Sequence, residues 1–156
     1  MKDANIYNQY PKYLGRFVSM VREQVAATSP QAVADYLLRS VYHPFDDFEQ
    51  EEVVALLLNA RQRITHRVLV ARGTLTSALV RPADLYRTAV RANAAGLILA
   101  HNHPSGEAQI SDDDCVITRR LSEAAKILDI EFHDHLVIGR DSWTSIREQD
   151  PTLFEG

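Results

Sequence analysis

The segment from His101 to Asp114, HNHPSGEAQISDDD, carries side chains that could bind one metal ion. His101 and His103 are two residues apart, and Ser111 and Asp114 follow His103 after eight and eleven residues. The two imidazoles and the carboxylate could supply three ligands to a single ion. Zinc in hydrolytic sites commonly takes three nitrogen and oxygen ligands and keeps a fourth position open for water. The residue types therefore point to metal-assisted hydrolysis.

The elements around this segment could bring the three ligands together. Residues 97–100 form an apolar run that predicts a buried strand ending at His101. Side chains two residues apart in an extended chain point to the same side, so His101 and His103 can face one ion. A helix is predicted to start at Ser111, with Asp114 in its first turn. That helix start would return the carboxylate toward the histidines.

The same residues also have a structural interpretation. Ser-x-x-Asp before an apolar helix is the pattern of a capping box, and acidic residues at a helix start interact favourably with the helix dipole. His101 and His103 could likewise be ordinary side chains at a strand end. Capping and catalysis are compatible for Ser111, because its backbone and its hydroxyl can serve different partners. The coincidence of two histidines with a returning carboxylate favours a site.

The rest of the pattern predicts an α/β protein with a mixed sheet and helices on both faces. Helices are predicted for residues 14–25, 30–41, 82–92 and 111–128, the third of them closed by Gly96. Strands are predicted for residues 53–58, 64–70, 74–80, 97–100 and 130–138, with a short closing element at 143–147. We expect residues 1–28 to form an N-terminal arm (residues 1–12) and helix, and residues 29–156 to form one domain.

Composition narrows the class of protein. The chain has 156 residues, 46% of them hydrophobic, which suffices for one core. The single cysteine, Cys115, leaves no internal disulfide and fits a reducing compartment. No signal-peptide core and no apolar run of membrane-spanning length is present, so we expect a cytoplasmic protein without a membrane partner. The net charge of −4 argues against a dedicated nucleic-acid surface.

The spacing of His101-x-His103-Pro104, Ser111 and Asp114 resembles the signature of the JAMM/MPN metallopeptidases. Other segments, in the right order over about residues 29–148, narrow the resemblance to the bacterial RadC-like branch. These segments are Gly73-Thr74-Leu75, Asn93-Ala94-Ala95, the run HNHPSG from His101, and Asp134-His135. The resemblance implies a JAMM/MPN fold, which has a cytidine-deaminase-like architecture.

The resemblance also implies one Zn²⁺ per chain, held by His101, His103 and Asp114, with water as the fourth ligand. Ser111 would then hydrogen-bond that water or stabilise the oxyanion. The implied activity is that of a metalloprotease, a hydrolase that cleaves a peptide or isopeptide bond in a protein or peptide substrate.

The family also uses an upstream glutamate as general acid/base, eight residues before the asparagine that ends the first strand. That asparagine corresponds to Asn59, so the glutamate corresponds to Glu51. Glu49 and Glu52 are close rivals, since an acidic strand entry can simply be solvated. In the implied reaction Glu51 takes the proton of the zinc-activated water and passes it to the leaving amine.

A second histidine pair, His133 and His135, flanks Asp134 on a predicted strand. No third ligand follows at a convincing spacing, so we expect core or supporting roles for both. The Asp134-His135 pair matches the family and could orient a neighbour of the site.

The alternative function is a non-catalytic metal-binding module that acts through partners in a DNA-processing or mobile-element setting. Intact ligands favour the hydrolase, because a scaffold has no need of them. Longer RadC-like proteins carry a helix-hairpin-helix region, and residues 1–28 are too short for one, so we expect no direct contact with nucleic acid. A zinc nucleoside deaminase would need His-x-Glu and Pro-Cys-x-x-Cys segments, which a chain with one cysteine cannot supply.

Overall fold

The computed structural model describes residues 4–5, 17–76 and 79–155. Within these residues seven strands form one sheet in the order β1-β2-β4-β3-β5-β6-β7. The strands are β1 (Ala4–Asn5), β2 (Phe17–Met20), β3 (Glu52–Leu58), β4 (Ile64–Arg72), β5 (Gly96–Asn102), β6 (Glu131–Ile138) and β7 (Trp143–Ser145). β5 and β6 are parallel, whereas the other neighbouring strands are antiparallel. The prediction of a mixed sheet is confirmed.

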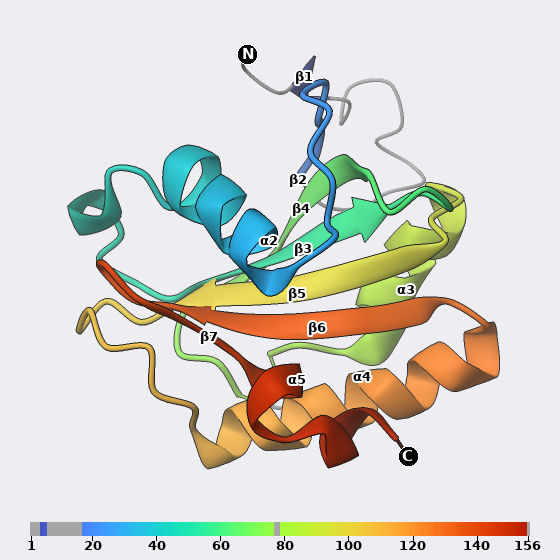
Figure 1. The fold of residues 1–156 in the computed structure, drawn as a ribbon. Helices are drawn as coiled ribbons and strands as arrows, with labels where there is room; N and C mark the ends of the chain where they lie inside the picture. The colour runs from blue at the N-terminus through green and yellow to red at the C-terminus, as the bar shows by residue number, and fades with distance from the viewer. Residues whose placement is uncertain (1–3, 6–16, 77–78, 156) are drawn as a thin grey trace.

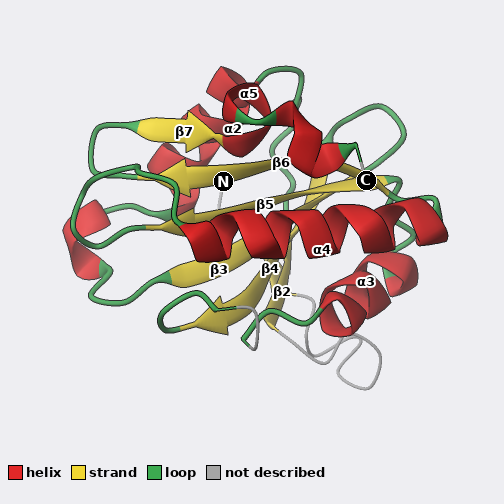
Figure 2. Cartoon of the chain, turned by 90° about the horizontal axis from the view of Figure 1, so that it is seen from below, coloured by secondary structure: helices red, strands yellow, loops and turns green. Residues whose placement is uncertain are grey.

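Helices cover both faces of this sheet, as predicted (Figure 1). α2 (Pro30–Tyr36) continues as a π-helical turn over Leu37–Val41 and lies on one face. α3 (Pro82–Arg91), α4 (Asp112–Leu128) and α5 (Ile146–Gln149) lie on the other face, where α4 runs alongside β5 and β6 (Figure 2). Short 3₁₀ turns occur at Phe45–Asp47 and Pro151–Phe154.

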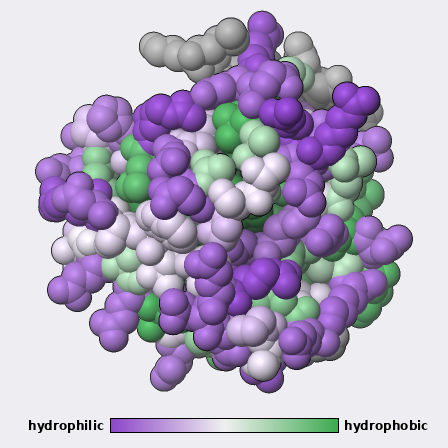
Figure 3. Space-filling model, in the orientation of Figure 1, coloured by the Kyte–Doolittle hydropathy of each residue, from purple (hydrophilic) through white to green (hydrophobic). Residues whose placement is uncertain are grey.

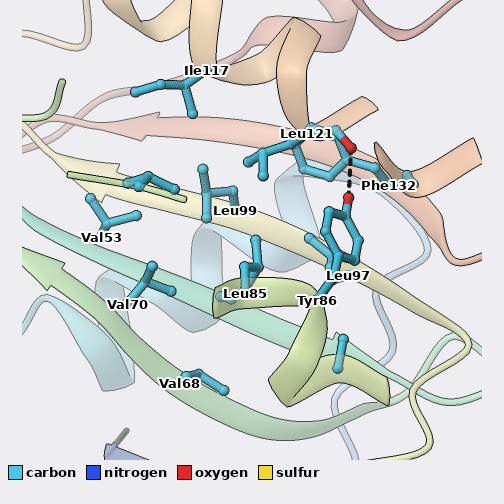
Figure 4. Close-up of a cluster of buried hydrophobic side chains, with 14 of the residues drawn as sticks. Val53, Val68, Val70, Leu85, Tyr86, Leu97, Leu99, Ile117, Leu121 and Phe132 are labelled. Carbon is cyan, nitrogen blue, oxygen red and sulfur yellow. Dashed lines mark hydrogen bonds between the residues drawn. The ribbon is translucent and has the colours of Figure 1, made fainter. Parts of the chain in front are cut away.

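Strand β3 supplies apolar side chains to both faces of the sheet. Val53, Ala55 and Leu57 belong to the cluster that also contains buried side chains of α3 and α4, part of which is drawn in Figure 4. The residues that alternate with them belong to the cluster under α2: Val54, Leu56 and Leu58. Burial on both faces explains the continuous apolar run of this strand.

The helix predicted for residues 14–25 is wrong where the structure describes it. Phe17–Met20 form β2, which pairs antiparallel with residues 66–69 of β4. So short an apolar stretch fits both a helical and a strand period, and pairing with β4 decides between them. In the predicted arm, Ala4–Asn5 pair with β2 as β1. Residues 1–3 and 6–16 lie outside the described residues.

The strand predicted for residues 74–80 is also wrong. The described residues form a loop in which the backbone N–H groups of Leu79 and Val80 both donate to the carbonyl of Thr76. Leu75 and Val80 are buried in the core, so their apolar character reflects burial and not strand pairing. Residues 77–78 lie outside the described residues.

Gly96 does not close α3, contrary to the prediction. The helix ends at Arg91, and Asn93 adopts the left-handed conformation with φ 54° that allows the chain to turn. Gly96 instead begins β5, where a Cβ atom would lie 2.6 Å from His133 Nε2. Close packing against β6 therefore accounts for the glycine.

The helices among the described residues are too short or too polar to cross a membrane. α4, with 17 residues, begins with three consecutive aspartates. On the face shown in Figure 3, apolar residues lie in small groups between hydrophilic ones.

Candidate metal centre

Strand β5 and the start of α4 bring the three predicted ligands to one place. His101 lies in β5, where it pairs with Val53 of β3 and Val137 of β6. His103 follows the end of the strand, and Asp114 is the third residue of α4. One ligand atom of each of the three residues lies within 4.8 Å of the others. The convergence predicted from strand and helix geometry is thus observed.

The distances between these atoms suit one small ion. His101 Nε2 lies 3.0 Å from His103 Nε2 and 3.2 Å from Asp114 Oδ1, and His103 Nε2 lies 3.9 Å from Asp114 Oδ2. A tetrahedral zinc site with bonds of about 2.0–2.2 Å keeps its ligand atoms roughly 3.3–3.5 Å apart. The side chains of His101 and Asp114 are 0% and 1% exposed, whereas that of His103 is 16% exposed. Solvent therefore reaches the cluster from the side of His103.

The start of α4 is both a helix cap and part of the cluster. The Ser111 hydroxyl accepts from the Asp114 N–H at 3.2 Å, and Asp114 Oδ2 accepts from the Ser111 N–H at 2.9 Å. This is a reciprocal capping box, and it leaves Oδ1 of the same carboxylate facing His101. The cap occupies a lone pair of the Ser111 hydroxyl and not its proton. The cap is therefore confirmed, and it is compatible with Asp114 also facing the two histidines.

The charge of Asp114 is favoured by its surroundings. Burial by itself would raise the pKa of this carboxyl. The hydrogen bond and positive charge that His101 supplies when its ring is protonated, together with the Ser111 N–H, outweigh burial and hold the pKa of Asp114 well below its usual value; a bound cation would act on Asp114 in the same direction. Asp114 is therefore present as a carboxylate, the form that binds a metal ion.

A chain of buried hydrogen bonds fixes the proton of His101. The Thr118 hydroxyl donates to the Asp114 carbonyl at 2.7 Å, so its oxygen accepts from His135 Nδ1–H at 2.8 Å. Burial, and then the neighbouring His101, hold the pKa of His135 well below its usual value, so its ring is neutral and Nε2 is an acceptor. His135 Nε2 then accepts from His101 Nδ1–H at 2.8 Å. In the neutral ring, His101 Nε2 then presents a lone pair to the cluster.

His103 also carries a proton on Nδ1, because of a different contact. Its Nδ1 lies 3.0 Å from the carbonyl oxygen of Glu107, which can only accept, so Nδ1 carries the proton. Its Nε2 therefore also presents a lone pair to the cluster. With no proton between them, two imidazole nitrogens and a carboxylate oxygen this close would repel one another, so either a proton or a metal cation has to lie among them. The donor set fits a zinc-type ion, with the remote ring nitrogens held as in known histidine–metal sites.

Glu51 is the glutamate of the strand entry that approaches the cluster. Its Oε1 lies 4.0 Å from His103 Nε2, and its Oε2 accepts from the Leu75 N–H at 2.6 Å. Glu52 is instead paired with Arg72 at 2.8 Å. Glu49 is exposed to solvent. Among the three candidates, the geometry therefore singles out Glu51.

The histidine pair of β6 divides between two environments. His135 contacts His101, as the supporting role predicted, while His133 lies 3.5 Å from the carboxylate of Glu131 at the molecule's surface. Sequence reasoning missed Thr118 as part of the site, although its position one helical turn after Asp114 was a usable signal. It also missed Asn102, whose side chain contacts appear only in the folded structure.

The part of the chain that contains this cluster is similar to known proteins. A sequence profile of the RadC-like JAB domain matches residues 27–151. A UPF0758 protein from Symbiobacterium thermophilum is 40% identical over 126 residues, which cover 81% of this chain and 52% of that protein. A UPF0758 protein from Chloroflexus aggregans is 40% identical over 131 residues, covering 84% and 56% of the two chains. One from Staphylococcus aureus is 39% identical over 125 residues, covering 80% and 56%. The chain spans about half the length of these relatives.

Proposed function

The chain belongs to the RadC-like JAB domain family, and on that premise we propose that it is a zinc-dependent hydrolase that cleaves a peptide or isopeptide bond. The observation that carries the proposal is the convergence of three potential ligand atoms, from His101, His103 and Asp114, beside the carboxylate of Glu51. A metal site with three protein ligands, open on one side, is the arrangement of hydrolytic zinc and not of structural zinc.

The three proposed ligands differ in burial and therefore in the part that each would play in binding the ion. His101 and Asp114 are buried and held by their own hydrogen bonds, so they would provide a fixed base for it. His103 is the exposed ligand, and substrate would approach on its side. When bound, zinc would lower the pKa of a water in its open position and polarise a substrate carbonyl.

Glu51 has the position expected of a general acid/base. Its Oε2 is held by the Leu75 N–H, so its Oε1 remains directed toward His103, and its side chain is 21% exposed. Glu51 Oε1 would accept the proton of the attacking water and deliver it to the nitrogen of the leaving amine. The other product is a carboxylic acid, so the atoms of water are shared between the two products. The Ser111 hydroxyl, whose proton the cap does not use, would donate to the oxygen of the reacting carbonyl.

The variant Glu51→Gln tests this proposal. It is nearly isosteric and lies outside the ligand set, so it should bind zinc like the wild type and lose hydrolysis by a factor of at least about 100. We would express both proteins in cells, isolate what Glu51→Gln retains, and identify it by mass spectrometry. The captured protein should then be cleaved by the purified wild type and not by the variant.

The same experiment addresses the alternative of a non-catalytic module. A partner that is retained equally by wild type and Glu51→Gln, and that the zinc-loaded wild type leaves intact, would favour the module and contradict the hydrolase. Unchanged turnover by Glu51→Gln would remove Glu51 from the reaction.

A further inference from the structure

The chain around Glu51 lies at the point where regular strand pairing stops. β3 and β5 pair from Leu58 opposite Gly96 as far as Val53 opposite His101. Glu51 precedes the first residue of β3, so no ladder with β5 holds it in place. A backbone position outside the ladder needs another contact to keep its side chain at a fixed distance from the metal ligands.

The side chain of Asn102 supplies that contact. Its Oδ1 accepts from the Glu52 N–H at 2.7 Å, and its Nδ2 donates to the Gln50 carbonyl at 3.1 Å. The two bonded residues are those immediately before and after Glu51. One carboxamide thus bonds the backbone on both sides of Glu51, where the pairing of β3 with β5 has ended. We call these two hydrogen bonds the Asn102 bracket. Asn102 is 0% exposed, so its carboxamide has little access to water as an alternative partner.

The chemistry of the bracket selects asparagine at this position. One backbone group is a donor and the other an acceptor, and a carboxamide offers one acceptor oxygen and one donor nitrogen on a short stem. An aspartate would set an oxygen against the Gln50 carbonyl. An aliphatic side chain would remove both hydrogen bonds, to the Glu52 N–H and to the Gln50 carbonyl.

Contacts from the loop that follows β4 complete the support of Glu51. Its carbonyl accepts from the Gly73 N–H at 2.8 Å, and its Oε2 accepts from the Leu75 N–H. These contacts fix one side of the residue, and Asn102 fixes the side nearest the ligands. Oε1 is left directed at His103 Nε2.

We propose that Asn102 is a positioning residue that sets Glu51 against the metal ligands. Asn102 lies between His101 and His103 in the chain, so the segment that holds the ion also holds the acid/base at a fixed distance from it. The inference rests on the proposed function, because it assigns Asn102 a role through Glu51. A displacement of about 1 Å in an acid/base group can cost roughly 100-fold in rate. Loss of the two Asn102 hydrogen bonds should therefore affect the reaction.

The test uses the 156-residue chain loaded with zinc, with acetohydroxamate as the probe, and measures probe binding by calorimetry. Acetohydroxamate ligates zinc through its oxygens and offers a hydrogen bond to a neighbouring carboxylate. Replacing that carboxylate in Glu51→Gln should weaken binding by about tenfold, since a charge-assisted hydrogen bond is lost. Asn102→Ala should bind zinc at the wild-type stoichiometry and weaken the probe by a similar factor.

The double variant separates positioning from general damage to the fold. If Asn102 acts through Glu51, Asn102→Ala should change probe affinity by less than about twofold in the Glu51→Gln background. A matched control is Tyr86→Phe, which removes a buried 2.7 Å hydrogen bond to the Leu121 carbonyl in the core (Figure 4). It should lower stability and leave probe affinity unchanged. Asn102→Ser, which puts one short hydroxyl in place of the carboxamide, serves as the same test if Asn102→Ala does not fold, and should weaken the probe measurably but by less than about tenfold.

Two results would overturn the inference alone. One is a wild-type probe affinity in Asn102→Ala or Asn102→Ser. The other is a double variant whose loss of probe affinity equals the product of the losses in Asn102→Ala and Glu51→Gln. A wild type that binds no zinc, or a probe affinity that Glu51→Gln does not change, would instead overturn the proposed function, and the inference with it.

Discussion

Thr118→Val removes one hydroxyl at the base of the metal centre and nothing else of that side chain's shape. Thr118 is 0% exposed, and its hydroxyl links the Asp114 carbonyl to His135 Nδ1. Without that acceptor, the proton of His135 can move to Nε2, where it would donate to His101 Nδ1. His101 would then carry its own proton on Nε2, the atom that faces the ion. We expect the variant to fold and to bind zinc more weakly.

The size of the effect follows from two independent figures. Leaving a buried donor without a partner costs about 1–3 kcal/mol. Loss of the hydrogen-bond partner behind a metal-ligating histidine typically costs about 10–100-fold in metal affinity. That range equals about 1.4–2.7 kcal/mol, so the two figures agree.

Competition with a chromophoric chelator measures the zinc affinity, and circular dichroism checks the fold. Ser122→Ala is the control, because Ser122 is buried on α4 one turn beyond Thr118 and is not among the ligands or their hydrogen-bonded partners described above. A zinc affinity in Thr118→Val within about twofold of the wild type, or an equal loss in Ser122→Ala, would refute the hydrogen-bond chain as the support of His101.

Other substitutions probe the surroundings of the site. In Gly139→Ala the new Cβ would lie 2.4 Å from the Gly106 carbonyl, so the loop after His103 must shift, and urea unfolding should show a loss of about 1–3 kcal/mol. Ser111→Ala removes the helix cap and should cost about 0.5–2 kcal/mol in the same assay while metal analysis finds the wild-type zinc content. Tyr42→Phe leaves the Glu52 carbonyl without its 2.7 Å bond and should cost about 1–3 kcal/mol in urea unfolding. An unfolding midpoint equal to the wild type would contradict each stability prediction.

The clustering of His101, His103 and Asp114 could be predicted from the sequence because local geometry brings these residues together. A strand end directs His101 and His103 to one side, and a helix that starts at Ser111 returns Asp114 within its first turn. The strongly periodic or continuously apolar segments, such as β3 and α4, were likewise predicted correctly. Their patterns are long enough to exclude the other period.

The supports of the site depend on tertiary pairing, which no local pattern encodes. Asn102 meets Glu52 across 50 residues of chain, and His135 meets His101 across 34. The failed helix at residues 14–25 has the same cause, since only the neighbouring strand β4 determines that Phe17–Met20 is extended. Glu51 needed the family resemblance to be chosen over its neighbours, and the contact of its Oε2 with Leu75 supplies a physical reason for that choice.

The zinc content of the purified protein tests the central claim most directly. The wild type, purified without chelators and analysed by mass spectrometry of the metal, should contain close to one zinc ion per chain. His101→Ala and His103→Ala should lose it, because each removes one of the converging donors, while Glu51→Gln should keep it. A wild type without stoichiometric metal, or histidine variants that retain full zinc, would contradict the account of this site as a metal centre.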